Sequence, residues 1–171
     1  METVDRQAVC DFVNREIVRF HQARLRRLEE ISLTEVLRKK NPYLFRAKNM
    51  LMASELVRAI LDAFLSSSEE KLFGDFLEQL ALFISQQTCG GIKSSAQGID
   101  LEFDREGTHY LVSIKSGPNW GNSSQYARLE EDFKRAVKVQ RQAHLAARIQ
   151  PVLGICYGNT APRIPAYMKR S

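Results

Sequence analysis

The sequence predicts an α/β fold with a central mixed β-sheet, preceded by an all-helical N-terminal segment. Residues from about 5 to 65 repeat apolar side chains at helical spacing. After residue 98, two runs alternate apolar and polar residues, a long amphipathic stretch follows, and a nearly continuous apolar run comes last. The two alternating runs predict a β-hairpin, and the helix after them would cross over to a strand in the same sheet.

The N-terminal helical segment is divided by local start and stop signals. Its first helix has apolar residues at helical spacing at Val9, Phe12, Val13, Ile17 and Phe20. Ser32 with Glu35 forms a capping box, and Asn41–Pro42 breaks the pattern. The serines at 66–68 predict a short loop before another amphipathic helix, "EEKLFGDFLEQLALFISQQ". We therefore expect a helical segment over residues 1–66 and a second domain over 67–171.

The predicted hairpin gathers polar residues on one face. In "GIDLEFD", alternation turns Ile99, Leu101 and Phe103 one way and the acids the other. In "THYLVSIK", Leu111 shares a face with the polar residues of the second strand, Ser113 and Lys115. If the strands pair with their apolar faces together, the polar set to converge is Asp100, Glu102, Ser113 and Lys115.

The segments after the hairpin are a loop, a helix and a strand. The loop, "SGPNWGNSS", is rich in glycine and asparagine and holds the only tryptophan. Ser123 or Ser124 would cap the following helix. The run "PVLGICYG", residues 151–158, is typical of a strand covered on both faces.

Composition narrows the class of protein. The chain has 171 residues, a net charge of +5 and hydrophobic content of 44%, as in a globular domain. Its three cysteines are widely spaced and match neither a zinc site nor a disulfide framework, which favours a reducing cytosol. No apolar run approaches the roughly 20 residues that span a bilayer, and the N-terminus does not resemble a secretory signal. We expect a cytoplasmic protein.

The excess of lysine and arginine over aspartate and glutamate favours a polyanionic partner. Residues 19–48 hold nine Lys and Arg residues against three glutamates. These basic residues are either a solvated helix face or contacts for nucleic-acid phosphates. The phosphate-contact candidates in this segment are Arg26, Arg27, Lys39 and Lys40.

Carboxylates beside a lysine suit phosphodiester hydrolysis. Mg²⁺ takes one or two carboxylate ligands and fills its remaining positions with water and substrate phosphate. It then acts as a Lewis acid and template for in-line attack. A lysine in the same patch holds the attacking water or neutralises developing charge.

These residues resemble the PD-(D/E)XK nuclease superfamily. Asp100 in "GIDLEF" matches the first motif acid, with Ile99 in place of the motif proline, and Lys115 in "SIK" matches the motif lysine. Ser113 stands where a second acid is expected. The stretch "SIKSGPNWGNSSQ" is similar to predicted type II restriction endonucleases. The resemblance covers about residues 68–158.

The resemblance implies a restriction-endonuclease-like core and a Mg²⁺-dependent DNA endonuclease with one or two metal ions. Asp100 would bind the metal, Lys115 would orient the attacking water, and Ser113 would add a weak polar contact. Acids that could replace the missing one are Glu102, Glu78, Glu130 and Glu131. DNA contacts are expected in the loop and helix start at Asn119, Trp120, Asn122 and Ser123. Double-stranded DNA and a second copy of the chain are the expected partners.

Other interpretations remain open at this point. The four hairpin residues could form an ordinary solvated face, with Lys115 paired across the strands. Glu130 and Glu131 are also explained by i,i+4 pairing with Lys134 and Arg135. The chain could be a nuclease that reads DNA structure, a nuclease-like DNA-binding module without catalysis, or a helical interaction domain.

Overall fold

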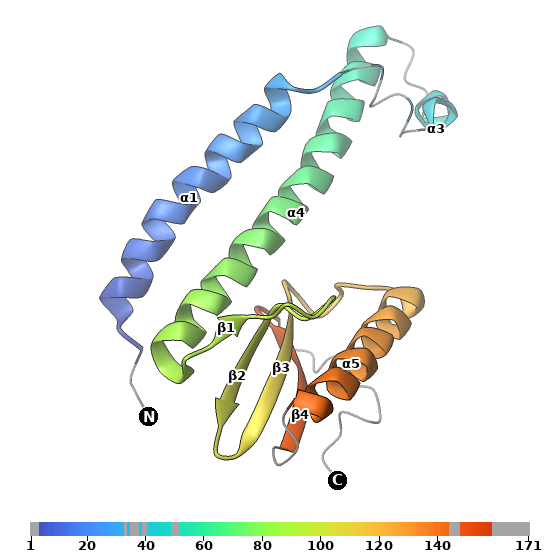
Figure 1. Cartoon of the computed structure of the whole chain (residues 1–171). Helices are drawn as coiled ribbons and strands as arrows, with labels where there is room; N and C mark the ends of the chain where they lie inside the picture. The colour runs from blue at the N-terminus through green and yellow to red at the C-terminus, as the bar shows by residue number, and fades with distance from the viewer. Residues whose placement is uncertain are drawn as a thin grey trace. The chain divides into compact units, whose positions relative to one another are not determined.

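The computed structural model describes residues 4–32, 34, 38, 41–48, 52–143 and 148–158 (Figure 1). The helices are α1 (Arg6–Glu29), α3 (Pro42–Ala47), α4 (Ala53–Cys89) and α5 (Ser123–Ala143). The strands are β1 (Ile92–Lys93), β2 (Leu101–Arg105), β3 (Thr108–Lys115) and β4 (Arg148–Ile155). Within these residues, no helix is long and apolar enough to cross a membrane.

The chain divides into two compact units, which we describe separately. The first unit comprises Met1–Asn14 and Phe76–Ser171, and the second comprises Arg15–Asp75. All of the strands and α5 lie in the first unit, together with the C-terminal part of α4. The predicted division of the chain at residue 66 stays a prediction.

The sheet of the first unit is mixed, with strand order β1-β2-β3-β4. β2 and β3 form an antiparallel hairpin in which Leu101 pairs with Val112 and Arg105 with Thr108. β4 pairs with β3 in parallel, and α5 makes the crossover between these two strands (Figure 1). The predicted α/β fold, with a hairpin, a helix and a returning strand, is confirmed.

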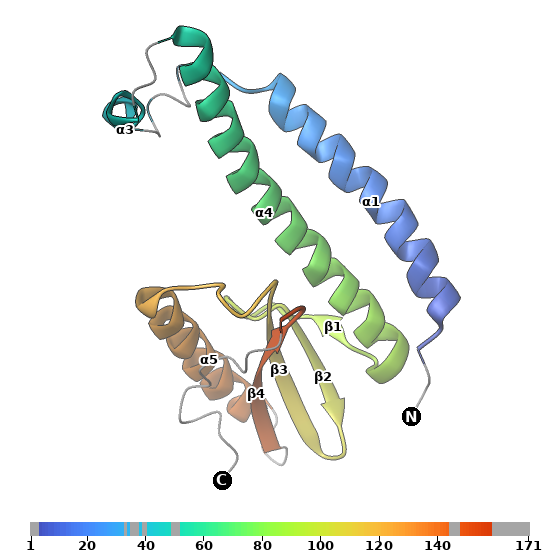
Figure 2. The same ribbon diagram turned by 180° about the vertical axis from the view of Figure 1, so that it is seen from behind.

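Helices cover both faces of this sheet (Figure 2). On one face Leu101, Val112 and Ile114 pack with Ala81 and Leu82 of α4. On the other face α5 contributes the second core, made of Ile99, Leu111, Leu129, Phe133 and Ala136. Each strand therefore needs apolar residues on both faces, and few positions remain for buried polar groups. Glu102, Ser113 and Lys115 share the α5 side of the sheet with Leu111.

In the second unit, α1 and α4 pack against each other. Phe20 meets Phe73 edge to face at a centroid distance of 6.2 Å, and Arg24 pairs with Glu69. Ile60 is buried in a small apolar cluster of this unit. The predicted break at Asn41–Pro42 is the start of α3, where Asn41 Oδ1 accepts the Tyr43 N–H at 3.0 Å.

The loop expected at 66–68 is wrong, because these residues lie inside α4. Ser67 turns its hydroxyl back along the helix and donates to the Ala63 carbonyl at 3.0 Å. A serine hydroxyl that bonds in this way finds its partner within the helix, so the serine need not end it.

The last predicted strand is displaced, since β4 covers Arg148–Ile155 and not 151–158. Its extent follows from its partner, because the pairing with β3 runs from Thr108 and Arg148 to Lys115 and Ile155. Pro151 is tolerated within it because β4 is at the edge of the sheet. β1 was not expected, since two residues are too few to show alternation; it exists through pairing with β2.

Candidate active site

Asp100 is fixed at the start of the hairpin by the end of β3. Its Oδ2 accepts the Ser113 hydroxyl at 3.2 Å and the Ile114 N–H at 2.5 Å, while its own N–H donates to the Val112 carbonyl at 2.8 Å. Both side-chain bonds use Oδ2, so Oδ1 is the oxygen that can take a further ligand. A carboxylate with one oxygen fixed in this way is preorganised to bind a hard cation.

The alternation expected before β2 fails at one position. Ile99 was predicted to share a face with Leu101 and Phe103, and this is wrong: Ile99 packs in the α5-side core with Leu111. The strand ladder begins only at Leu101, and the Ile99 N–H donates to the Ala96 carbonyl in a turn. Asp100 therefore reaches Ser113 from the short segment between this turn and β2, and not from a regular strand position.

Ser113 is the most deeply buried polar residue of the hairpin, with 0% of its surface exposed. Its hydroxyl donates to Asp100, which gives it a structural reason to be polar in an otherwise apolar strand. The hydroxyl thus fixes the orientation of the Asp100 carboxylate.

Lys115 ends β3 and is half-buried on the α5 side. Its Nζ lies 5.5 Å from the ring centroid of Trp120, and its carbonyl accepts the Cys156 N–H at 3.0 Å. Trp120 packs against the α5-side core. Among the salt bridges within the described residues, Lys115 has no ion pair with Asp100.

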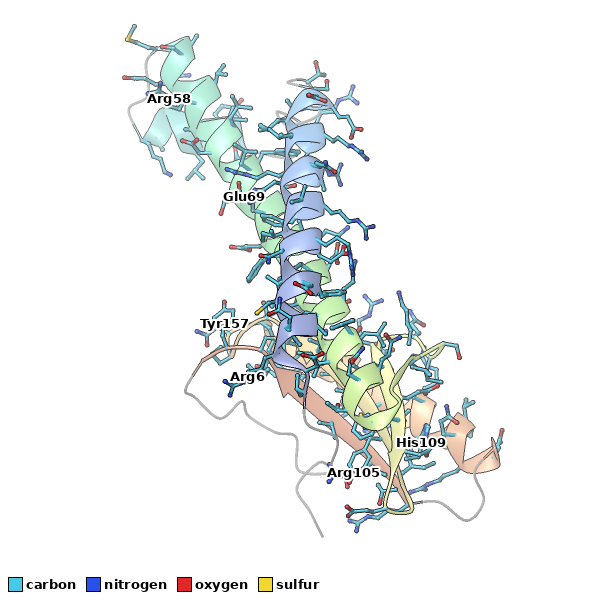
Figure 3. All side chains as sticks on the ribbon, turned by 90° about the vertical axis from the view of Figure 1, so that its left-hand side faces the viewer. Arg6, Arg58, Glu69, Arg105, His109 and Tyr157 are labelled. Carbon is cyan, nitrogen blue, oxygen red and sulfur yellow. The ribbon has the colours of Figure 1, made fainter. Side chains whose placement is uncertain are left out.

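Glu102 is buried and belongs to a polar network between the sheet and α5. Its Oε2 accepts the Ser94 hydroxyl at 3.3 Å and the Gln140 side-chain N–H at 3.2 Å, and it lies 3.7 Å from His109 Nε2. His109 Nδ1 is in turn 2.8 Å from Asp104 Oδ1. Figure 3 labels His109 near the hairpin turn, away from Tyr157. Glu102 thus points to a different set of partners from Asp100.

Glu78 lies on α4 near the end of β4. Partial desolvation raises the pKa of the exposed Cys156 thiol, and the charge of Glu78 raises it further. Cys156 directly follows β4, next to the position where Ile155 pairs with Lys115. Asp100, Lys115 and Glu78 therefore belong to the same end of the sheet, the end opposite the hairpin turn.

Two of the three acids of α5, Glu130 and Glu131, lie on the surface of the helix. Glu130 pairs with Lys134 at 2.8 Å, which confirms the predicted i,i+4 contact, and Glu131 is exposed. Sequence reasoning missed Asp132, which is buried against Gly98; a Cβ at Gly98 would lie 2.4 Å from its carboxylate. The positive φ of Gly98 and this close approach explain the glycine just before Asp100.

The loop after Lys115 leads into an N-cap at Asn122, so the caps expected at Ser123 or Ser124 are wrong. Asn122 Oδ1 accepts the Gln125 N–H at 3.1 Å, and Gln125 Oε1 accepts the Asn122 N–H at 2.8 Å. This reciprocal pair is a capping box with asparagine and glutamine in its two places.

The remaining predicted DNA-contact residues are distributed over both units. Asn119, Asn122 and Ser123 are exposed in the first unit, and Arg26 and Arg27 are exposed in the last turn of α1 in the second. Lys39 and Lys40 lie outside the described residues.

The acids of the site offer oxygen ligands, which suit a hard cation such as Mg²⁺. In the described ranges, no group of three or more His, Cys, Asp or Glu side chains is close enough to hold a metal together. Mg²⁺ keeps several waters and needs only one or two carboxylates, which Asp100 can supply with one further acid.

A family model matches nearly the whole chain. It describes type II restriction endonuclease EcoO109I, and it covers residues 7–171. The chain belongs to this family. The match confirms the resemblance drawn from Asp100 and Lys115, and it extends over α1 and the first half of α4, where the sequence showed no resemblance. No curated protein matches the chain. Membership of the EcoO109I family makes the chain a nuclease of the type II restriction endonuclease kind.

Proposed function

We propose that the chain is a Mg²⁺-dependent endonuclease that hydrolyses phosphodiester bonds of double-stranded DNA at specific sites. The observation that carries the proposal is Asp100, held by Ser113 and the Ile114 N–H within a chain of the EcoO109I family. The enzyme would act in the cytoplasm. It would be a homodimer, since twofold dimers suit the two strands of a symmetric site.

Asp100 would be the principal metal ligand, through Oδ1. The second carboxylate would be Glu78, whose charge reaches Cys156 beside Lys115. Glu102 lies instead beside Ser94 and Gln140. Bound Mg²⁺ would supply a Lewis acid for the phosphate. Ser113 would keep Asp100 in its orientation, in place of the acid expected at that position.

Lys115 would hold the attacking water and offset the negative charge that develops on the phosphate. Asn119, Asn122 and Ser123 would contact the DNA near the scissile bond, because they are exposed on the loop and helix start that follow Lys115. Arg26 and Arg27 would contact phosphates. Lys39 and Lys40 are proposed for the same role from their charge alone.

The choice of second carboxylate is tested by the matched pair Glu78→Gln and Glu102→Gln. We expect Glu78→Gln to lower the single-turnover cleavage rate by about 10- to 100-fold and to raise the Mg²⁺ concentration required. Glu102→Gln keeps an acceptor oxygen for Ser94 and Gln140, so its rate should stay within about threefold of the wild type. The reverse pattern would assign the ligand to Glu102.

The proximity of Glu78 to Cys156 can be tested without DNA, through the reactivity of the Cys156 thiol. In a Cys10→Ser, Cys89→Ser background, Glu78→Gln should lower the pKa of Cys156, because a negative charge that disfavours the thiolate is removed. At a fixed pH below this pKa, a larger fraction of Cys156 is then thiolate, and iodoacetamide should label it faster. The Glu131→Gln variant serves as the control, and equal labelling rates in both variants would place Glu78 away from Cys156.

A second function, a nuclease-like DNA-binding module without catalysis, is favoured by one observation. Ser113 carries no carboxylate and is fully buried. Isothermal titration with Mg²⁺ separates the two proposals. An enzyme should bind Mg²⁺ in a way that Asp100→Asn abolishes, and an inactive module should bind DNA without any carboxylate-dependent affinity for the metal.

A further inference from the structure

Trp120 is held in place from several sides. Its ring packs against the α5-side core and lies 4.5 Å, centroid to centroid, from Tyr126 in the first turns of α5. The loop before it is fixed at Gly117, where a Cβ would lie 2.6 Å from the Tyr157 ring. The Tyr157 N–H also donates to the Ser116 carbonyl at 3.1 Å. The indole is therefore a rigid surface.

The indole uses its ring and not its polar atom. Trp120 Nε1 is buried without a hydrogen-bond partner among the described residues. The contacts that the described residues make with Trp120 are contacts with its ring. Lys115 Nζ lies 5.5 Å from the ring centroid, within the range of a cation–π contact, for which tryptophan is the best aromatic partner.

A lysine at the end of a strand needs such a partner to be held in one orientation. Its side chain is a flexible four-carbon chain that carries a compact charge. In the described part of the chain no salt bridge joins Lys115 to Asp100, and the contact that the structure gives its ammonium is the Trp120 ring. The ring leaves the ammonium hydrogens available, because a cation–π contact does not occupy them as a carboxylate would.

We propose that Trp120 is a positioning residue for Lys115, whose ring face holds the ammonium where it meets the attacking water. This inference rests on the proposed function and deepens it. It also assigns Trp120 a role different from the DNA contact expected from the sequence. Because Trp120 acts through Lys115, its loss should slow the chemical step and leave DNA affinity unchanged.

The kinetic test compares Trp120→Leu with Trp120→Phe. Leucine keeps an apolar side chain without a ring face, and phenylalanine keeps a ring and removes the unpartnered N–H. We expect Trp120→Leu to lower the single-turnover rate at saturating DNA by roughly 10- to 100-fold. Trp120→Phe should stay within about fivefold of wild type. Both should bind duplex DNA in Ca²⁺ with wild-type affinity. Circular dichroism and thermal unfolding establish that each variant is folded.

The contact itself has a spectroscopic readout, since Trp120 is the only tryptophan of the chain. Replacing Lys115 by Met should change the intensity or wavelength of the tryptophan emission, because a cation leaves the ring face. Lys93→Met is the matched control, a lysine exposed on β1 of the same sheet, and it should leave the emission unchanged.

Three results would overturn the inference. One is weaker DNA binding by Trp120→Leu at an unchanged cleavage rate. The second is an equal loss of cleavage rate in Trp120→Leu and Trp120→Phe. The third is a tryptophan emission that Lys115→Met does not alter. A failure of the proposed function looks different: the folded wild type would cleave no DNA with Mg²⁺, while Lys115→Met would still change the emission.

Discussion

Asp100→Asn is expected to abolish Mg²⁺-dependent DNA cleavage while the protein stays folded. A metal that polarises the phosphate contributes several kcal/mol to catalysis, so the loss should be about 10³-fold or more. Asparagine retains an oxygen that can accept from Ser113 and Ile114, which is why the hairpin should keep its structure. The measurement is cleavage of a long mixed-sequence DNA with Mg²⁺ and with EDTA, for wild type and variant.

The pattern of cleavage products also separates the kinds of nuclease. Discrete bands that the variant loses identify a site-specific enzyme, and a smear that it loses identifies one that is nonspecific or reads DNA structure. Glu131→Gln is the matched control, an exposed acid on α5, and should cleave like wild type. Full activity of Asp100→Asn would remove Asp100 from the metal site, and a folded wild type without activity would favour the inactive module.

Lys115→Ala is the second change with a large expected effect. It removes the cation proposed to hold the attacking water and to offset charge on the phosphate, and we expect a rate loss of about 10²- to 10³-fold. DNA affinity in Ca²⁺ should change little, because this charge would act mainly in the transition state. The measurement is single-turnover cleavage of an end-labelled duplex at saturating enzyme.

Two further results bear on Lys115. Lys115→Arg keeps the charge but replaces a compact ammonium by a planar group, so we expect it to restore only a small part of the rate. Lys93→Ala, at an exposed position on β1, should keep full activity. If Lys115→Ala cleaved at the wild-type rate, the lysine would have no part in the mechanism.

Local sequence patterns predicted which segments are helices and which are strands. Where each helix or strand begins and ends depended on the elements that it pairs or packs with. Alternation was sufficient for the hairpin, because β2 and β3 each have a face toward α4 and a face toward α5. Two predictions from the sequence were wrong for this reason. The serines at 66–68 were predicted to form a loop, and the last strand was predicted to begin at Pro151. A serine's effect depends on whether its hydroxyl bonds back to a helix carbonyl, and the length of β4 depends on β3.

The sequence by itself determined the fold class and the hairpin, and it placed an acid and a lysine at positions that resemble the motif of a nuclease superfamily. These depend on period and spacing, which are local properties of the chain. Only the tertiary structure decided which partners the acids have. Asp100 meets Ile114 across 14 positions, and Glu102 meets Gln140 across 38. Such contacts depend on how strands and helices pack, so two acids that look equivalent in the sequence acquire different partners.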